Sequence, residues 1–354
     1  MNGIRAALTI AVWFLLNHLI TTTPATAACY SENSRNRLAN FCAVNKLKGS
    51  EISVKNLEFI NQQLNLEGFS TNLGFPKQVS VNTVNTSLNP IFFYTENLNG
   101  GNSPEPLVLG GLSLDGETEL HRKEGFVAGL SAGLSGRYIH AEGRYLDYGI
   151  STSSAHNPKH GLDIASTSAN FCSINHIKNW WYLDACAHTS RLRKDITDNV
   201  SSNISLISSK MYVSSKDTHS EASFGINRYF AETYSQNQVL LGFETIHSSG
   251  VYSSADVTLG EFIKNELSTR LALRARITNQ IAQKPLTLSV SYAYADGSLL
   301  LGFKRSDETY EISASYPIWN RIKIGIGYKQ TDSTINYFDI DTPTFSIQFP
   351  SLSF

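Results

Sequence analysis

The chain has 354 residues and carries 29 Lys and Arg against 30 Asp and Glu, so it is almost electrically neutral. This balance shows no basic patch of the kind that nucleic-acid-binding proteins carry, and we expect no nucleic-acid partner. Charged residues are only 17% of the chain, whereas Tyr and Phe are abundant, with 16 and 18 copies against 2 Met. Because Tyr and Phe favour strands and membrane interfaces, this composition indicates an all-β protein.

The N-terminus has the three parts of a secretory signal peptide. Arg5 supplies the positive charge, residues 6–20 are mainly apolar, and Ala25-Thr26-Ala27 forms a small-residue cleavage site. The apolar run is shorter than the ~20 residues of a membrane-spanning helix, which favours a cleaved signal over a membrane anchor. We therefore expect residues 1–27 to be removed on export through the inner membrane.

Four cysteines remain in the mature chain, and export to an oxidising compartment favours disulfides. Four cysteines allow three pairings, of which the local one closes the shortest loops. This pairing joins Cys29 to Cys42 and Cys172 to Cys186. A metal site would need CxxC spacing or clustered His, and the cysteines show neither. We predict two disulfides and assign no metal ligands or cofactor.

Residues 28–78 differ from the remainder of the chain. In the run EISVKNLEFINQQLNL, Leu57, Ile60 and Leu64 have the spacing of a helix rather than a strand. Gly68 and Pro76 then end the helical pattern. This segment is either a small periplasmic appendage or a plug inside a barrel, and the residues alone do not choose between them.

Alternation of apolar and polar residues dominates the last third of the chain. Leu271 and Leu273 alternate with Ala272 and Arg274, and a similar pattern covers residues 286–295. Successive side chains of a strand point to opposite faces, so each segment has one apolar face and one polar or small-residue face. Similar segments, separated by Gly, Asn, Ser, Asp and Pro, recur from Val79 onward. Residues 107–114 form one of these predicted strands.

One hairpin can be tested by its register. Asp296-Gly297 is a strong two-residue turn signal, and folding about it sets Tyr292 opposite Leu301. A second turn, predicted at Ser306-Asp307, sets Leu301 opposite Ile312. Both turns would keep the apolar residues of three strands on one face, which a one-residue slip would destroy.

The end of the chain, TFSIQFPSLSF, resembles the closing strand of Gram-negative outer-membrane β-barrel proteins. Such strands alternate hydrophobic residues, end in an aromatic residue, and are read by the barrel-assembly machinery. Pro350 breaks the alternation and puts the residues before it out of phase with those after it. The residues that carry this resemblance are Phe345, Ile347, Phe349, Leu352 and Phe354.

These observations predict an antiparallel transmembrane β-barrel of roughly 12 to 16 strands over residues 79–354, preceded by a short, partly helical segment. A secreted β-sandwich is the alternative, because its strands also carry one apolar face. The number of strands and the C-terminal resemblance favour the barrel. Its location would be the outer membrane, in contact with lipid and lipopolysaccharide.

Charged residues on the polar face of these strands are the first candidates for function. In an open barrel they would line a pore and set its ion preference, whereas in a filled barrel they would pair across the lumen. The candidate pore-lining residues are Arg270, Arg274, Arg276, Glu244, Lys304, Glu311, Lys323 and Lys329.

Three functions are compatible with such a barrel. We favour a porin-like channel for small polar solutes. The alternative is a barrel with a filled lumen that serves as an anchor, a receptor or a surface-export component. A barrel hydrolase would use His140 or His247, but no GxSxG nucleophile motif is present and we assign no catalytic residue. His156, His160 and Asp163 are interpreted as a polar loop rather than a metal site.

Overall fold

The computed structural model describes residue 29 and residues 36–47, 54–69, 82–247, 249–282, 284–319, 322–350 and 352–353. The predicted signal peptide, the expected domain boundary at residue 78 and Phe354 lie outside the described residues. None of the helices in these ranges has both the length and the apolar character needed to cross a bilayer.

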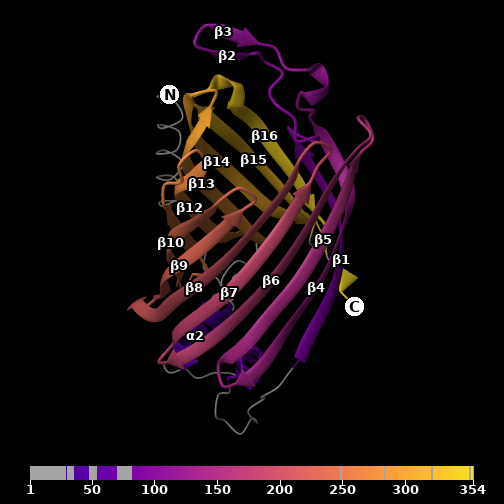
Figure 1. Ribbon diagram of the computed structural model, residues 1–354. Helices are drawn as coiled ribbons and strands as arrows, with labels where there is room; N and C mark the ends of the chain where they lie inside the picture. Colours follow the sequence, from indigo (N-terminus) through magenta and orange to yellow (C-terminus); the bar gives the residue numbers. More distant parts are fainter. Residues whose placement is uncertain are drawn as a thin grey trace.

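The described residues form a closed antiparallel barrel of fourteen strands (Figure 1). The strands follow one another around the barrel in chain order, and β16 closes it by pairing with β1. The predicted all-β barrel is therefore confirmed. The barrel strands are β1 (Asn82–Thr95), β4 (Gly125–Ala141), β5 (Arg144–Asn157), β6 (Leu162–Lys178), β7 (Trp181–Arg193), β8 (Asp198–Ser215), β9 (Thr218–Ala231), β10 (Ser235–His247), β11 (Tyr252–Gly260), β12 (Ser268–Ile281), β13 (Lys284–Leu300), β14 (Phe303–Trp319), β15 (Ile322–Ser333) and β16 (Ile340–Gln348).

The two ends of the barrel differ in their connections. At one end the connections are tight, for example Glu142-Gly143 between β4 and β5 and Lys216-Asp217 between β8 and β9. We call this the short-turn end. At the opposite, long-loop end, residues 96–124 connect β1 to β4. This loop contains β2 (Leu107–Leu109), β3 (Leu112–Leu114) and the 3-10 helix η2 (Thr118–Leu120).

The predicted strand at residues 107–114 does not belong to the barrel. It forms the separate β2–β3 hairpin, which turns at Gly110 and Gly111 and projects past the strand ends (Figure 1). Both glycines have positive φ, of 55° and 88°, which interrupts an extended strand. A short apolar run in a loop therefore carried the same pattern as a membrane strand.

The predicted turns at Asp296-Gly297 and Ser306-Asp307 are wrong. β13 continues past Gly297 through a bulge, and the chain reverses at Leu301-Gly302. Tyr292 consequently pairs with Tyr310 rather than with Leu301. Gly297 has a φ of 115°, and a bulge uses this conformation as readily as a turn does. The apolar face is kept, because Val290 pairs with Ile312.

The closing strand has one extra residue at Pro350. Gln348 of β16 pairs with Ile91, whereas Leu352 of β17 (Leu352–Ser353) pairs with Leu88. Four residues of the C-terminal segment thus oppose three of β1, which is the geometry of a bulge. The extra residue restores the phase that Pro350 interrupts, so Leu352 points to the same outer side as Ile347.

Among the described residues, two helices precede the barrel, α2 (Asn36–Leu47) and α3 (Val54–Asn65). The helix predicted from Leu57, Ile60 and Leu64 is confirmed as α3, and Ile60 and Leu64 are buried. α2 was not predicted, because its buried side chains include the polar Arg37 and Asn40 as well as Leu38. Polar residues at buried positions hide the apolar periodicity on which helix prediction depends.

Both disulfides have the predicted local pairing. Cys29 is joined to Cys42, which ties residue 29 to α2. Cys172 on β6 is joined to Cys186 on β7, directly across the strand pair.

Candidate functional site: the barrel lumen

The lumen face of the barrel is identified by the side chains that contact the N-terminal helices. Asp184 on β7 and Glu221 on β9 both bind Arg37 of α2. Directly paired residues of neighbouring antiparallel strands point to the same side of a sheet. The register therefore extends this face around the barrel, from Glu244 on β10 to Arg276 on β12 through Ser254.

α2, α3 and the turn as far as Phe69 fill part of the lumen at the short-turn end. We call these residues the N-terminal plug. Tyr182, Met211 and Ile246 of the barrel lie in one buried cluster with Leu38 and Leu64 of the plug. A buried apolar contact of this kind contributes favourably to docking, by about 25 cal/mol for each Å² removed from water.

Arg37 is the main polar contact between the plug and the barrel. Its Nη2 and Nε donate hydrogen bonds to Glu221 at 2.5 and 3.2 Å, and its Nη1 donates to Asp184 at 2.6 Å. Burial alone would lower the pKa of Arg37, but the carboxylates of Glu221 and Asp184 outweigh it and raise that pKa. One guanidinium thus stays charged and joins two strands to α2.

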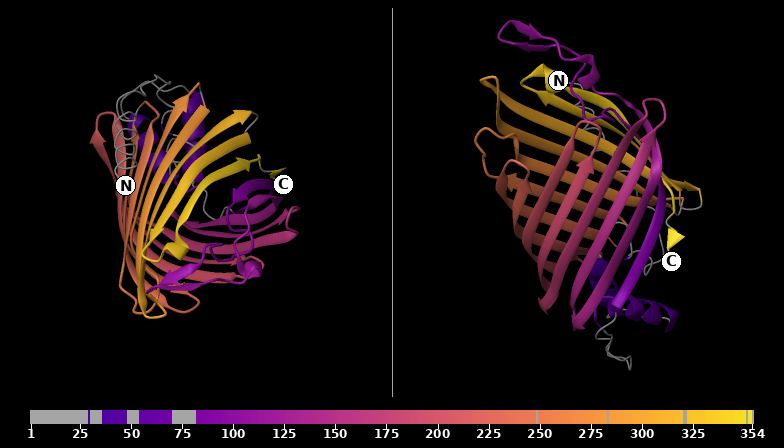
Figure 2. Two further views of the ribbon diagram at one scale, coloured as in Figure 1. Left: turned by 90° about the horizontal axis from the view of Figure 1, so that it is seen from above. Right: turned by 45° about the vertical axis from the view of Figure 1, so that its right-hand side comes forward.

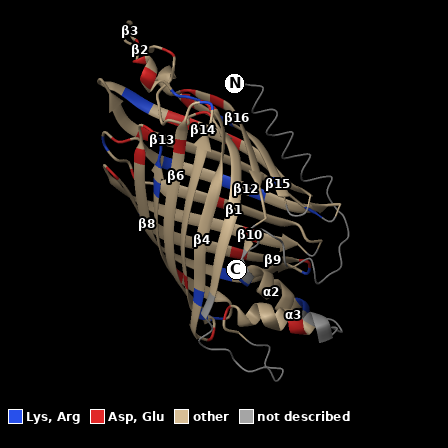
Figure 3. Ribbon diagram, turned by 90° about the vertical axis from the view of Figure 1, so that its right-hand side faces the viewer, with Lys and Arg blue, Asp and Glu red and all other residues tan. Residues whose placement is uncertain are grey.

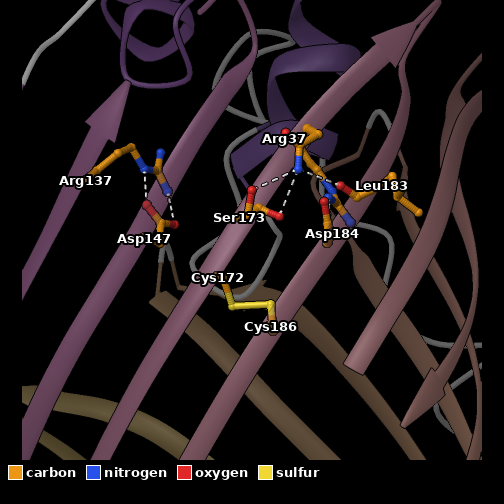
Figure 4. Close-up of a disulfide and its surroundings, with 9 residues drawn as sticks. Arg37, Arg137, Asp147, Cys172, Ser173, Leu183, Asp184 and Cys186 are labelled. Atoms are coloured by element: carbon orange, nitrogen blue, oxygen red, sulfur yellow. Dashed lines mark hydrogen bonds and ion pairs between the residues drawn. A yellow bond between two sulfur atoms is a disulfide. The ribbon is translucent and has the colours of Figure 1, made fainter. Parts of the chain in front are cut away.

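Arg137 of β4 makes a second polar contact from the barrel side. It forms a two-bond ion pair with Asp147 of β5, at 2.6 and 2.7 Å, and donates to the Leu66 carbonyl of the plug at 2.9 Å. Figure 4 shows this pair and Arg37 beside the Cys172–Cys186 disulfide. The plug is therefore held by arginines from both partners.

Trp180 adds an aromatic contact at the short-turn end. Its ring centroid lies 5.3 Å from that of Phe41 on α2 and 5.7 Å from that of Phe69. Trp180 and Asn179 form the β6–β7 turn with φ values of 59° and 48°. This left-handed conformation is unusual for a bulky residue, and here it brings the indole against the plug.

Glu67 is a buried carboxyl group at the base of the plug. Burial raises its pKa to about 7, although a hydrogen bond from Asn40 and the charges of Arg137 and Arg37 act in the opposite direction. Only 1% of its surface is exposed. Its protonation therefore changes in the neutral pH range, at the contact between plug and barrel.

The loop of residues 96–124 covers part of the long-loop end, and we call it the lid. In one direction around the rim it contacts the β7–β8 loop, where Lys194 Nζ donates to the Asn97 carbonyl at 2.6 Å. In the other direction Arg122 donates to the Asp339 carbonyl in the β15–β16 loop, next to η3 (Asn336–Phe338). Figure 2 shows this segment bending over the end of the barrel.

The lumen face between plug and lid is polar and accessible. Asn170 and His188 on neighbouring strands are exposed although they point inward. Serine pairs line the same wall at 2.7–2.9 Å between hydroxyl oxygens, and the pairs are Ser151 with Ser168, Ser153 with Ser166, and Ser190 with Ser201. By contrast, lumen-facing Tyr182 under the plug and Val127 near the lid are fully buried.

The outer face has the opposite character. Exposed Leu273, Phe224 and Ile326 point away from the lumen on strands spread around the barrel. Figure 3 shows Lys, Arg, Asp and Glu gathered mainly toward the two ends, with a largely uncharged wall between them. A lipid environment requires every backbone polar group to be paired, and a closed barrel meets this requirement. The apolar outer wall and the polar lumen also match those of membrane barrels. The protein has the architecture of an outer-membrane β-barrel.

The register places most of the predicted pore-lining residues of this barrel on one sector of the lumen face. Arg274 and Arg276 on β12 and Glu311 on β14 alternate with outward-pointing neighbours, and Glu311 is paired with Lys329 on β15. Lys323 lies on the same face of β15, and Glu244 is buried near the plug. Their role in conduction stays a prediction.

Arg270 and Lys304 lie elsewhere, at the long-loop rim. Arg270 is in the β12 bulge, donates to the Gly260 carbonyl at 3.1 Å and lies 5.3 Å from the Phe262 ring. Lys304 pairs with Leu299 next to the hairpin turn. Both positions are bulge or turn positions, where strand alternation no longer predicts the face.

The residues considered for other chemistry are not brought together. His140 on β4 and His247 on β10 point outward from opposite parts of the barrel. His156 Nδ1 lies 2.8 Å from Asp163 Oδ1 across β5 and β6, in an exposed pair. In the part of the chain that the structure describes, no three His, Cys, Asp or Glu side chains are arranged to hold a metal.

No protein-family model and no curated protein matches the sequence. Similar solved structures include OccK9 (OpdG) of Pseudomonas aeruginosa, which is 9% identical with a TM-score of 0.41, over 77% of this chain and 98% of that one. OccK2 (OpdF) of the same organism, in complex with glucuronate, is 9% identical with a TM-score of 0.41, over 78% and 100%. A BenF-like porin from Pseudomonas fluorescens Pf-5 is 9% identical with a TM-score of 0.37, over 78% and 100%. At such low values, function must be inferred from the barrel's own residues.

Proposed function

We propose that the protein is a porin-like channel of the outer membrane that passes small polar solutes. The observation that carries this proposal is the accessible polar band of the lumen between plug and lid. A barrel that served only as an anchor would gain stability by burying apolar side chains there instead. The lumen-facing serines and Asn170 can replace the hydration shell of a polar solute during passage.

The charged sector of the lumen supports a weak preference for anions. Glu244 and Asp307 on this face are buried. The remaining charges of the sector are four cations, Arg274, Arg276, Lys323 and Lys329, and two carboxylates, Asp256 and Glu311. Such rings of side-chain charge set the selectivity of other channels. Because the opposite wall carries uncharged hydroxyl and amide groups, we propose that the barrel takes solutes with several hydrogen-bonding groups rather than bare ions.

The orientation follows from the unequal ends. Bacterial barrels place short turns in the periplasm and long loops outside the cell, so we propose that the plug faces the periplasm and the lid faces outward. We further propose that residues 1–27 direct export, that residues 28–78 are the plug domain, and that the assembly machinery reads the C-terminal strand. Contact with lipopolysaccharide would then occur at the long-loop end.

Planar-bilayer recordings test this function. We expect stable, ohmic single-channel currents from the purified barrel, with a larger conductance after deletion of residues 28–78. The second candidate is a non-conducting receptor or anchor, which the tight docking of Arg37 favours. Absence of current both with and without residues 28–78, from protein that keeps its heat-modifiable gel mobility, would exclude the channel and favour this second candidate.

A further inference from the structure

A pocket of about 620 Å³ opens at the long-loop end, between the β11–β12 loop and the β13–β14 hairpin. Phe262 and Lys264 of the loop line it together with Tyr294, Leu299 and Lys304 of the hairpin. Tyr294 alternates with the lumen-facing Ala293 and Ala295, so it belongs to the outer side of the wall. The pocket is therefore on the lipid side of the barrel, separate from the lumen.

The pocket lies just beyond an aromatic group on the outer face. Tyr292 and Tyr310 are paired there, with ring centroids 5.1 Å apart, and Tyr294 is one step nearer the rim. Toward the middle of the barrel the outer face continues with Val290 and Ile312. Tyr residues mark the level at which acyl chains meet headgroups. A ligand in this pocket would thus have its apolar part level with the chains and its polar part level with the headgroups.

The lysines of the pocket are not used by the protein. Both Lys264 and Lys304 are exposed, and within the described ranges neither side-chain ammonium group has a hydrogen-bond or ion-pair partner. The lining has two other charged side chains, those of Asp296 and Arg305. Asp296 accepts a hydrogen bond from the Tyr294 hydroxyl at 3.1 Å, and Arg305 is paired with Asp307.

The pocket therefore combines two ammonium groups with an apolar floor. Phe262 is 52% exposed and Leu299 is 49% exposed, an unfavourable arrangement in water that a bound acyl chain would relieve. Arg270, over the Phe262 ring, adds a third cation close by. Ammonium and guanidinium groups bind phosphate oxygens with strong, charge-assisted hydrogen bonds.

We propose that this pocket binds the phosphorylated headgroup of an outer-leaflet glycolipid of the lipid A class. The phosphate lies between Lys264 and Lys304, and an acyl chain packs on Phe262 and Leu299. This site does not depend on conduction, since it is on the outer wall, but it rests on the proposed orientation with the long-loop end outside the cell. A soluble phosphate compound would satisfy the lysines but would leave the apolar floor in water.

Native mass spectrometry of the detergent-solubilised barrel tests the proposal with three probes. These are bis-phosphorylated lipid A, the same lipid A after removal of its phosphates, and inorganic phosphate. We expect a one-to-one adduct with the phosphorylated lipid alone. Equal retention of the dephosphorylated lipid would overturn the phosphate contact, and an equally stable adduct with inorganic phosphate would overturn the lipid assignment.

Charge reversal identifies the site. The double variant K264E/K304E is expected to bind lipid A roughly tenfold more weakly or worse, because it replaces two attractions with two repulsions. The matched control is K159E, an exposed lysine in the β5–β6 loop at the same end of the barrel. An equal loss in K159E, or no loss in the double variant, would overturn the proposal. Heat-modifiable gel mobility verifies that both variants fold.

Discussion

Arg37 on α2 and Glu221 on β9, which are 184 residues apart in the sequence, form a buried ion pair with two hydrogen bonds in the lumen. Asp184 completes the contact from β7. A buried ion pair of this kind adds little net stability when intact, but breaking it leaves charges buried without a partner. The plug is therefore docked in a way that a single substitution can disturb.

Arg37→Ala should release the plug. Removal of the guanidinium leaves Glu221 and Asp184 beneath α2, and docking should weaken by about 3–5 kcal/mol. Limited proteolysis should then cut α2 and α3 much faster than in the wild type, and single-channel conductance should rise.

Two controls separate docking from general effects. Arg191→Ala removes a similar ion pair with Asp198 at the exposed rim and should change neither readout. The triple variant R37M/D184N/E221Q removes all three charges together and should regain part of the protection. If R37A left both proteolysis and conductance unchanged, the plug would not be held by this contact.

Docking of the plug should weaken as pH rises. The pKa of Glu67 is raised from 4.5 to about 7 in the docked state, so that state binds the extra proton between these pH values. A carboxyl group whose pKa is raised on docking weakens docking when it ionises. The free energy of docking should become less favourable by roughly 3 kcal/mol above pH 7 and should be unaffected below pH 4.5. Protease protection of α3 should therefore fall between pH 4.5 and 7. Glu67→Gln should flatten this dependence, whereas the same fall in E67Q would assign the effect to another group.

Gly100 should control the lid. Its φ is +83°, and a Cβ there would lie 2.2 Å from Thr197 Oγ1 in the β7–β8 loop. Gly100→Ala should therefore push the lid away from that loop, at a cost of about 2 kcal/mol or more, and raise conductance. Gly111→Ala is the control, because Gly111 has a φ of +88° with nothing within 4 Å of its Cβ position. If G100A and G111A changed the conductance equally, the change would come from backbone strain and not from the contact between the lid and Thr197.

Reversal of two lumen charges should reverse ion preference. In R274E/R276E the charged sector changes from an excess of cations to an excess of carboxylates, and the barrel should become cation-selective. The reversal potential in a salt gradient should change sign relative to the wild type. R191E is the control outside the lumen. An unchanged reversal potential in R274E/R276E would show that this sector does not face the conduction path.

The alternation of apolar and polar residues predicts the barrel strands. It reports one apolar face per strand, and this property depends only on residues two positions apart. It predicts Leu271 and Leu273 as outward and Arg274 as inward without information on strand pairing. Turn signals were less reliable. Gly297 and Gly302 both have positive φ, but only the second lies at the end of a strand. Pairing of β13 with β14 resumes after Gly297, where Ser298 pairs with Arg305.

The plug contacts could not be predicted in the same way. Arg37 and Asn40 make α2 look like a polar surface segment. The partners of Arg37 are on β7 and β9, more than a hundred residues away in the sequence. A local pattern carries no information on such partners. The lid was hidden for a related reason, because its β2–β3 hairpin has the composition of a membrane strand.

Cysteine substitution at two adjacent residues of β13 tests the central claim most directly, namely that a water-filled lumen lies inside an apolar wall. All four native cysteines are in disulfides, so a new cysteine supplies a single free thiol. A membrane-impermeant thiol reagent should reduce the current of Ala293→Cys stepwise, because this side chain faces the lumen. It should leave Tyr292→Cys unaffected, because that side chain faces lipid. Block of Y292C but not of A293C, or no current from either barrel, would contradict the account.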